Sequence, residues 1–519
     1  MGTIEDSVDG IFAALREGAL TMQAGGGVGY DFSTLRPRGS RARSTGNVAS
    51  GPVSFMRIWD VTCATMLSTG ARRGAMMATL RCDHPDVEDF IDAKQTPATL
   101  SHFNCSVLIS DSFMEAVTRD ADWPLVFPAD ALAADGGTGA TVERDWPGRE
   151  GPVPCRVVRR VSARELWRRL MRATYDHAEP GVLFIDRINA ADNLRGLERI
   201  HATNPCGEVP LPPYGACDLG SVNLTRFVVD PFGPGAALDL EAIAAIVPLA
   251  VRMLDNVIDV SLFPLAAQAE QARATRRIGL GFTGLADTLA MLGLHYGDEP
   301  ARALAGRIMR TIRDAAYGAS ADIAREKGPF PRFDADRFLA APGPATLPAH
   351  LRDAIARHGV RNSHLTAVAP AGTISLLAEN VSSGIEPAFA LRYRRQVRTA
   401  RGDTRSFELE NFALRRWRTR HGDALPPESL VTATELPARA HLAMQAAVQP
   451  WVDHAISKTV NVPEALPFDA FEALYAEAYA LGLKGCTTYR PNPVTGAVLS
   501  SAPAAATAVP SCGADRECD

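Results

Sequence analysis

Short apolar runs that are typical of buried strands alternate with helical segments along most of this sequence. Residues 102–110 (HFNCSVLIS), the run GVLFIDRIN from Gly181 and residues 364–370 (HLTAVAP) predict strands. Residues 6–24 and 468–485 carry apolar side chains at helical spacing. Parallel strands need a long crossover, which is usually a helix, so the alternation predicts an α/β fold with a largely parallel sheet. The pattern does not distinguish an open sheet from a closed barrel.

Bulk properties exclude several classes of protein. The chain has 519 residues, of which 46% are hydrophobic and 22% charged, so a large core is expected. The net charge of -5 argues against a nucleic-acid surface. No apolar stretch approaches the ~20 residues that a membrane helix needs, and Met1 is followed by GTIEDS rather than by a basic signal segment. We therefore expect a cytoplasmic protein with neither membrane nor nucleic acid as partner.

Two segments differ from this pattern. Residues 120–155 are rich in Pro, Gly, Asp and Ala without a sustained period, which predicts an irregular excursion from the core. Residues 498–519 are rich in Ala, Pro and Ser, which predicts a flexible tail. This tail nevertheless contains Cys512 and Cys518.

The nine cysteines do not indicate a disulfide framework, because their number is odd and the composition is that of an intracellular chain. The sequence has neither an HExxH nor a CxxC motif, so no metal site is expected. Cys63, Cys82, Cys105 and Cys155 are predicted to be packing thiols.

A glycine motif invites a nucleotide-binding interpretation. GLGFTG (279–284) formally matches GxGxxG, but ARATRRI precedes it instead of an apolar strand. Tight helix packing is therefore favoured over dinucleotide binding.

The segment PAGTISLL (370–377) follows a predicted strand. Its Gly372, Thr373 and Ser375 are small residues that allow the amides of a helix start to face a phosphate. The same residues also make an ordinary capped turn, so both interpretations stay open.

The segment NPCGE (204–208) places an amide, a thiol and a carboxylate at alternate positions, and Cys217 follows eleven residues after Cys206. In extended geometry alternate side chains share a face, so Asn204, Cys206 and Glu208 are expected to point together. The alternative is a small core thiol beside a solvated glutamate. The arrangement favours an active site.

NPCGEVPLPPYGACDLGSVNL strongly resembles the finger loop of ribonucleotide reductases. Other segments resemble the family in the family's order, among them GARRGAMMATLR, FNCSVLISDSFM, RRIGLGFTGLAD and DHAISKTVNVP, and the resemblance covers nearly residues 1–497. Three segments resemble those of the adenosylcobalamin-dependent class II enzymes rather than those of the class I large subunit, which needs a metal-radical partner. They are GVGYDFSTLRP, GTISLLAENVSSGIEP and GLKGCTTYRPNPVTGAVL.

The resemblance implies a ten-stranded α/β barrel over residues 1–497, with the NPCGE loop at its centre. It implies radical reduction of ribonucleotides, expected to be diphosphates, to 2′-deoxyribonucleotides with adenosylcobalamin as cofactor. In this scheme Cys206 carries a thiyl radical, Glu208 is the general base, Asn204 holds the sugar and Cys217 is a redox thiol.

The resemblance also implies a second redox thiol on the first barrel strand, at a position that would precede residue 1. We therefore expect this chain to lack that strand and the family's N-terminal helical region. Cys512 and Cys518 resemble the family's tail pair, which exchanges with the active-site disulfide and is reduced by a thioredoxin-type donor.

Further site residues follow from the same resemblance. Substrate contacts are expected from the glycine-rich start, the finger loop and the phosphate segment: Gly27, Asn204, Pro205, Cys206, Gly207, Glu208, Ala371, Gly372, Thr373, Ile374 and Ser375. A deoxynucleotide effector and the loop that reports it are expected at Asp6, Arg36, Arg43, Arg72 and Arg73.

Three functions stay open on the sequence: an adenosylcobalamin-dependent reductase, a class I large subunit with a radical-generating partner, and a nucleotide-binding paralogue without activity. GCTTYRPN contains only Tyr489 where class I chains have a tyrosine pair, which favours the first function. A homodimer, or a separate chain that supplies the N-terminal region, is the expected assembly.

Overall fold

The computed structural model describes residues 1–41, 48–66, 74–96, 99–132, 139–398 and 404–491. Its main sheet has the strand order β1-β2-β3-β7-β17-β16. These strands are β1 (Val28–Asp31), β2 (Met76–Arg81), β3 (Phe103–Ile109), β7 (Gly181–Phe184), β17 (Gly485–Tyr489) and β16 (Thr459–Asn461). The first four are parallel, and β17 runs antiparallel to β7.

A second set of parallel strands continues from the β16 side. Strand β10 (Asp218–Asn223) pairs with β13 (Ile278–Thr283), whose Leu280 bridges to Thr366. Val368 in turn bridges to Ile456, just before β16. The backbone ladder therefore runs without a break from β1 to β10 and joins two halves of opposite strand direction.

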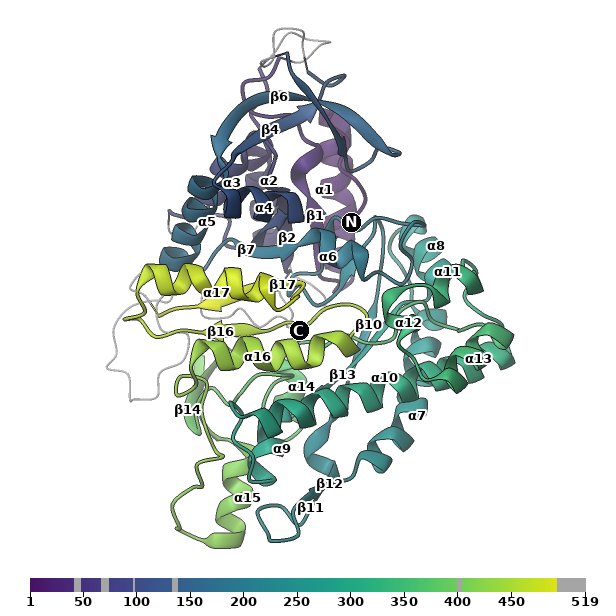
Figure 1. Cartoon of the computed structure of the whole chain (residues 1–519), viewed down its shortest axis with the longest axis vertical. Helices are drawn as coiled ribbons and strands as arrows, with labels where there is room; N and C mark the ends of the chain where they lie inside the picture. The colour runs from purple at the N-terminus through teal and green to yellow at the C-terminus, as the bar shows by residue number, and fades with distance from the viewer. Residues whose placement is uncertain (42–47, 67–73, 97–98, 133–138, 399–403, 492–519) are drawn as a thin grey trace.

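This arrangement confirms the predicted α/β class, whereas the described residues do not form a closed barrel. Among the described residues no backbone pairing joins β1 to β10, so the ladder is not closed. In Figure 1 the two halves lie one above the other, with the yellow strands β16 and β17 between them.

Helices cover the outer faces of both halves. Those associated with the first half are α1 (Val8–Gln23), α2 (Pro52–Thr65), α3 (Val87–Asp92), α4 (Asp111–Arg119), α5 (Ala163–His177), α6 (Ile185–Ala190) and α17 (Phe468–Ala480). The remaining helices are α7 (Leu240–Val260), α8 (Ala266–Thr275), α9 (Leu285–Met291), α10 (Glu299–Lys327), α11 (Ala335–Leu339), α12 (Pro342–Ala345), α13 (Ala349–His358), α14 (Gly372–Leu377), α15 (Phe412–His421) and α16 (Ala438–Val448). No helix in the described ranges is long and apolar enough to cross a membrane.

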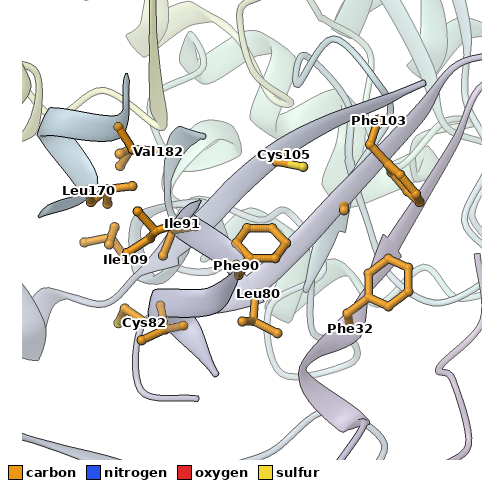
Figure 2. Close-up of a cluster of buried hydrophobic side chains, with 14 of the residues drawn as sticks. Phe32, Leu80, Cys82, Phe90, Ile91, Phe103, Cys105, Ile109, Leu170 and Val182 are labelled. Atoms are coloured by element: carbon orange, nitrogen blue, oxygen red, sulfur yellow. The ribbon is translucent and has the colours of Figure 1, made fainter. Parts of the chain in front are cut away.

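Each half has its own hydrophobic core. Figure 2 shows part of the first core, in which Phe32, Leu80, Phe90, Phe103 and Cys105 are labelled. The predicted packing thiols Cys63, Cys82, Cys105 and Cys155 are all buried in hydrophobic clusters, as expected. The second core packs β13 against α7, α10 and α16.

The segment predicted to be irregular, residues 120–155, contains regular structure. Strands β4 (Asp122–Pro128), β5 (Thr141–Asp145) and β6 (Pro152–Ser162) form a separate antiparallel sheet in the order β4-β6-β5, seen at the top of Figure 1. Val126, Phe127 and Trp146 give it a small core of its own. The prediction was wrong because three short strands that are stabilised by pairing with one another leave no long periodic pattern.

The interpretation of GLGFTG was also wrong, because the motif lies on strand β13 and not in packed helices. A Cβ at Gly281 would lie 2.2 Å from the carbonyl oxygen of Ala367. These glycines therefore allow residues 364–368 to approach β13 closely.

Three two-stranded hairpins complete the described strands: β8 (Ala202–Thr203) with β9 (Pro210–Leu211), β11 (Val228–Val229) with β12 (Ala237–Leu238), and β14 (Arg392–Arg398) with β15 (Thr404–Glu410). The predicted tail, residues 498–519, lies outside the described residues.

Candidate active site

The NPCGE segment forms the turn of a hairpin, residues 202–211, which we call the finger hairpin. Its strands β8 and β9 pair Thr203 with Pro210, and the backbone N–H of Asn204 donates to the carbonyl of Val209 at 3.2 Å. Gly207 has φ +82°, a conformation that favours glycine, and its N–H closes the turn on the carbonyl of Asn204 at 3.2 Å. The turn places Cys206 at the tip of the hairpin with a half-exposed side chain.

Glycines just before and within β1 allow the finger hairpin to approach this strand closely. A Cβ at Gly29 would lie 1.8 Å from the carbonyl oxygen of Thr203, and one at Gly27 would lie 2.9 Å from Cδ of Pro205. The side chain of Asn104 on β3 donates to the carbonyl of Pro205 at 2.8 Å. The hairpin therefore lies directly on the first half of the sheet.

Glu208 joins the hairpin to the second half. Its backbone carbonyl accepts the N–H of Ala455 at 2.9 Å, and its side chain is only 2% exposed. Burial raises the pKa of the Glu208 carboxyl to about 7, although a hydrogen bond from the Asn204 side chain acts in the opposite direction. Oε2 of Glu208 has no partner among the described atoms. This carboxyl can therefore both hold and accept a proton near neutral pH.

Cys217 lies directly before β10, and its side chain has intermediate exposure. Its Sγ donates to the carbonyl of Asp218 at 3.5 Å and lies 3.7 Å from Nε2 of His454. Burial and the charge of Asp218 raise the pKa of the Cys217 thiol well above its usual value, and the charge of Glu208 acts in the same direction. His454 precedes Ala455, the backbone partner of Glu208, so this segment connects Cys217 to the finger hairpin. Neither Cys206 nor Cys217 is in a disulfide.

The predicted phosphate segment lies one strand away from Ala455, the backbone partner of Glu208. Ala371 has φ 57° and is the residue before the short helix α14, whose Ser375 hydroxyl donates to the carbonyl of Gly372 at 2.7 Å. Val368, three residues before Ala371, donates its N–H to the carbonyl of Ala455 at 3.1 Å. The remaining predicted residues of this segment, Thr373 and Ile374, lie in the first turn of α14.

Only part of the predicted effector site is described. Arg36 donates from Nε to Asp6 at 2.7 Å, and its backbone N–H also contacts this carboxylate at 3.2 Å. Arg43, Arg72 and Arg73 lie outside the described residues, as do Cys512 and Cys518 of the tail. Asp6 and Arg36 are therefore brought together, whereas the other members of this prediction are not placed.

The sequence interpretation missed a buried polar cluster beside Cys217. Its members are His454, the stacked His364, Asp192 and Arg277. These four residues come from four separated parts of the chain, so no local spacing indicates them. No group of three or more metal-binding side chains occurs among the described residues.

Comparison with known protein families gives a match over nearly the whole described chain. The model of the family described as "Ribonucleotide reductase, barrel domain" matches residues 1–489.

Similar proteins have related names. A vitamin B12-dependent ribonucleoside-diphosphate reductase of Mycobacterium tuberculosis strain CDC 1551 is 42% identical over 96% of this chain and 68% of its own length. One of the same name from Thermoplasma acidophilum is 34% identical over 96% of this chain and 62% of its own length. A vitamin B12-dependent ribonucleotide reductase of Streptomyces clavuligerus is 28% identical over 96% of this chain and 57% of its own length.

Proposed function

The chain belongs to the ribonucleotide reductase barrel-domain family, and we propose that it reduces ribonucleoside diphosphates to 2′-deoxyribonucleotides with adenosylcobalamin as cofactor. The names of the similar proteins from Mycobacterium tuberculosis and Thermoplasma acidophilum support the reaction and the cofactor. The observation that carries the assignment of residues is the finger hairpin, which presents the half-exposed Cys206 next to the buried carboxyl of Glu208.

The tip of the finger hairpin fits a radical-generating cofactor. Cys206 is half-exposed there, and a Cβ at Gly207 would meet nothing within 4 Å, so the space beside the turn is open. When bound, adenosylcobalamin supplies a carbon radical that takes a hydrogen atom from a thiol. Cys206 and Gly207 would face this group, and Cys206 is the thiol that carries the radical to the ribose 3′ hydrogen.

Glu208 and Asn204 act on the sugar. With a pKa of about 7, the Glu208 carboxylate accepts the proton of the ribose 3′ hydroxyl and so promotes loss of the 2′ hydroxyl as water. The Asn204 amide, which already bonds to this carboxylate, keeps it and the sugar in register. Burial of Glu208 at 2% exposure keeps bulk water away from this carboxyl.

Cys217 supplies reducing electrons together with a second thiol. Two thiols that form a disulfide release two electrons and two protons, which balances the replacement of the 2′ hydroxyl by hydrogen. A thioredoxin-type dithiol then restores the thiols through Cys512 and Cys518.

The remaining contacts are assigned by position. We assign the nucleotide phosphates to Gly27 and to residues 371–375, because Gly27 adjoins Pro205 and the segment 364–370 adjoins Ala455. We assign a deoxynucleotide effector to the Asp6 and Arg36 pair. We assign Arg43, Arg72 and Arg73 to the same effector function on the family resemblance. We further propose a ten-stranded barrel, in which one more strand pairs with the β1 and β10 edges.

An assay with purified full-length chain tests this function. With a ribonucleoside diphosphate, adenosylcobalamin, dithiothreitol and a segment that supplies the second redox thiol, we expect 2′-deoxyribonucleotide to form without a metal-radical subunit. Glu208→Gln should reduce kcat by about a hundredfold or more, since general-base catalysis contributes that much. Activity that depends on an added metal-radical subunit would instead indicate a class I large subunit, and nucleotide binding without product would indicate an inactive paralogue.

A further inference from the structure

The imidazole of His454 touches the sulfur of Cys217. Nε2 of His454 lies 3.7 Å from Sγ, while the same Sγ lies 3.5 Å from the backbone carbonyl of Asp218. A carbonyl only accepts, so the S–H of Cys217 points to Asp218. In the tautomer that carries its proton at Nε2, His454 then donates to the lone pairs of the sulfur.

The position of this imidazole is fixed from several sides. Its ring stacks on that of His364, with centroids 4.7 Å apart and planes inclined by 25°. His364 is held in turn by Asp192, whose Oδ1 lies 2.9 Å from its Nε2. The backbone N–H of His454 donates to the carbonyl of Thr366 at 3.1 Å, and Nζ of Lys484 donates to the carbonyl of His454. These contacts leave the ring little freedom to turn away from the sulfur.

The same short segment also holds the finger hairpin. Ala455, the next residue after His454, donates its backbone N–H to the carbonyl of Glu208 at 2.9 Å. The imidazole beside Cys217 and the carboxyl beside Cys206 are therefore fixed by one piece of backbone.

Charged groups surround the thiol and the imidazole. Asp218 and Glu208 oppose a negative charge on Cys217, whereas the buried guanidinium of Arg277 favours it. Burial is the main cause that opposes a positive charge on His454, and His364, Arg277 and Lys484 act in the same direction, whereas a backbone hydrogen bond with Ile278 favours that charge. Asp453, whose carboxylate accepts the hydroxyl of Tyr317, is the carboxylate adjacent to His454 in sequence. The neutral imidazole is therefore the form of His454 that this environment favours.

We propose that His454 is a catalytic residue for the redox thiol: its N–H stabilises the sulfur of Cys217 when that sulfur carries negative charge, and His364 with Asp192 are its positioning residues. This inference rests on the proposed function of Cys217. It assigns a function to His454 and His364, which the radical chemistry of the finger hairpin and the cofactor does not require.

The step that needs this help is reduction of a disulfide at Cys217. A thiolate of the external dithiol attacks the partner sulfur, the disulfide bond breaks, and its electron pair leaves on Sγ of Cys217. The second thiolate of the reductant then attacks the mixed disulfide, which closes the reductant's own disulfide and releases the partner sulfur. The partner sulfur and Sγ of Cys217 each take one proton from solvent. Burial makes the thiolate of Cys217 costly, so a hydrogen bond from Nε2 lowers the barrier of this step.

The rate at which iodoacetamide alkylates Cys217 measures the same stabilisation, because only the thiolate reacts. In the reaction a carbon–sulfur bond forms, iodide leaves and the thiol proton goes to solvent. The full-length Cys206→Ser chain is the background, so the result does not depend on turnover. Peptide mapping by mass spectrometry locates the label at Cys217.

Removal of the donor should slow this alkylation. At a fixed pH below the pKa of Cys217, His454→Leu should react about tenfold more slowly, because it loses one hydrogen bond to a charged group. Its pH profile should shift upward by about one unit. His454→Gln places an amide where Nε2 lies, so its rate should stay close to that of the background chain. His454→Asn is too short to reach the sulfur and should be as slow as His454→Leu.

The control is His441→Leu, which removes another buried histidine whose Nδ1 contacts Nζ of Lys458 at 3.0 Å and not Cys217. Its Cys217 profile should equal that of the background chain. Equal rates for His454→Gln and His454→Asn would overturn the proposal, even if His454→Leu does not fold. Failure of the proposed function would appear separately, as absence of product in the reductase assay.

Discussion

Glu208 combines near-complete burial with a carboxyl that titrates near pH 7. Its folded-state pKa lies above the usual value of 4.5, so the folded protein binds the proton more tightly than the unfolded chain does. Stability from this group is therefore fully present below pH ~4.5 and is lost as the pH rises toward about 7. The cause is burial, which disfavours the charged carboxylate.

This titration predicts a pH-dependent difference between the native chain and Glu208→Gln, which cannot ionise. Between pH ~5 and ~8 the free energy of unfolding of the native chain should fall by about 3 kcal/mol relative to the variant. Urea unfolding at several pH values measures this difference. A constant difference across the range would contradict the raised pKa.

The local chemistry of NPCGE was predictable from the residues themselves, because an amide, a thiol and a carboxylate lie within five positions. The structure adds what the spacing did not contain, namely that Asn204 bonds to Glu208 across a turn whose glycine has positive φ. His454 was not predictable, because its partner Cys217 is more than two hundred residues away in sequence.

At the scale of elements, the finger hairpin lies so close to β1 that no side chain fits between them. Gly29→Ala should therefore displace the hairpin, since its Cβ would lie 1.8 Å from the carbonyl oxygen of Thr203. We expect a loss of about 3 kcal/mol in the free energy of unfolding, or loss of the folded hairpin, together with loss of reductase activity.

A matched control for this substitution is Gly318→Ala in α10, where the nearest atom to the added Cβ is Cδ2 of Leu351 at 3.4 Å. Alanine is also the better helix former, so this variant should be as stable as the native chain or more so. Thermal unfolding of both variants makes the comparison. Equal stability of Gly29→Ala and Gly318→Ala would show that the hairpin does not approach β1 as described.

Elements with a strong local pattern were predicted well. Residues 6–24 form α1, residues 102–110 contain β3, and the amphipathic run from residue 468 forms α17. The GLGFTG segment was not predicted well. Its glycines leave room for Ala367 and Leu219, which are distant in sequence. Close approach between strands is a non-local requirement that a local motif does not reveal.

Across the whole molecule, buried contacts between the halves surround the candidate site. Lys484, at the start of β17, donates to the carbonyl of Asp453 at 2.7 Å and also to that of His454. Burial lowers the pKa of Lys484 from 10.5 to about 8. A base with a lowered folded-state pKa makes the folded protein bind fewer protons, so its burial penalty disappears as the pH rises from about 8 to 10.5.

Lys484→Met should remove this pH dependence. Relative to the variant, the native chain should gain about 3 kcal/mol in free energy of unfolding between pH ~8 and ~10.5. Guanidinium unfolding at these pH values measures the gain. A gain of zero would mean that the ammonium group is solvated and does not join the halves.

The α/β class and the family were predictable from the sequence, whereas the course of the ladder from β1 to β10 was not. That ladder depends on single bridges such as Leu280 with Thr366 and Val368 with Ile456, which join segments of irregular backbone. Residues 364–368 carry the pattern of a strand but make too few regular pairs to form one.

The central claim is that the sulfur of Cys206 carries the radical. The most direct measurement is deoxyribonucleotide formation by Cys206→Ser, with Cys155→Ser as the control, because Cys155 is a buried thiol in the separate β4-β6-β5 sheet. A serine O–H does not yield its hydrogen atom as an S–H does. Cys206→Ser should form no product above background, whereas Cys155→Ser should retain activity. Product formation by Cys206→Ser at the native rate would contradict it.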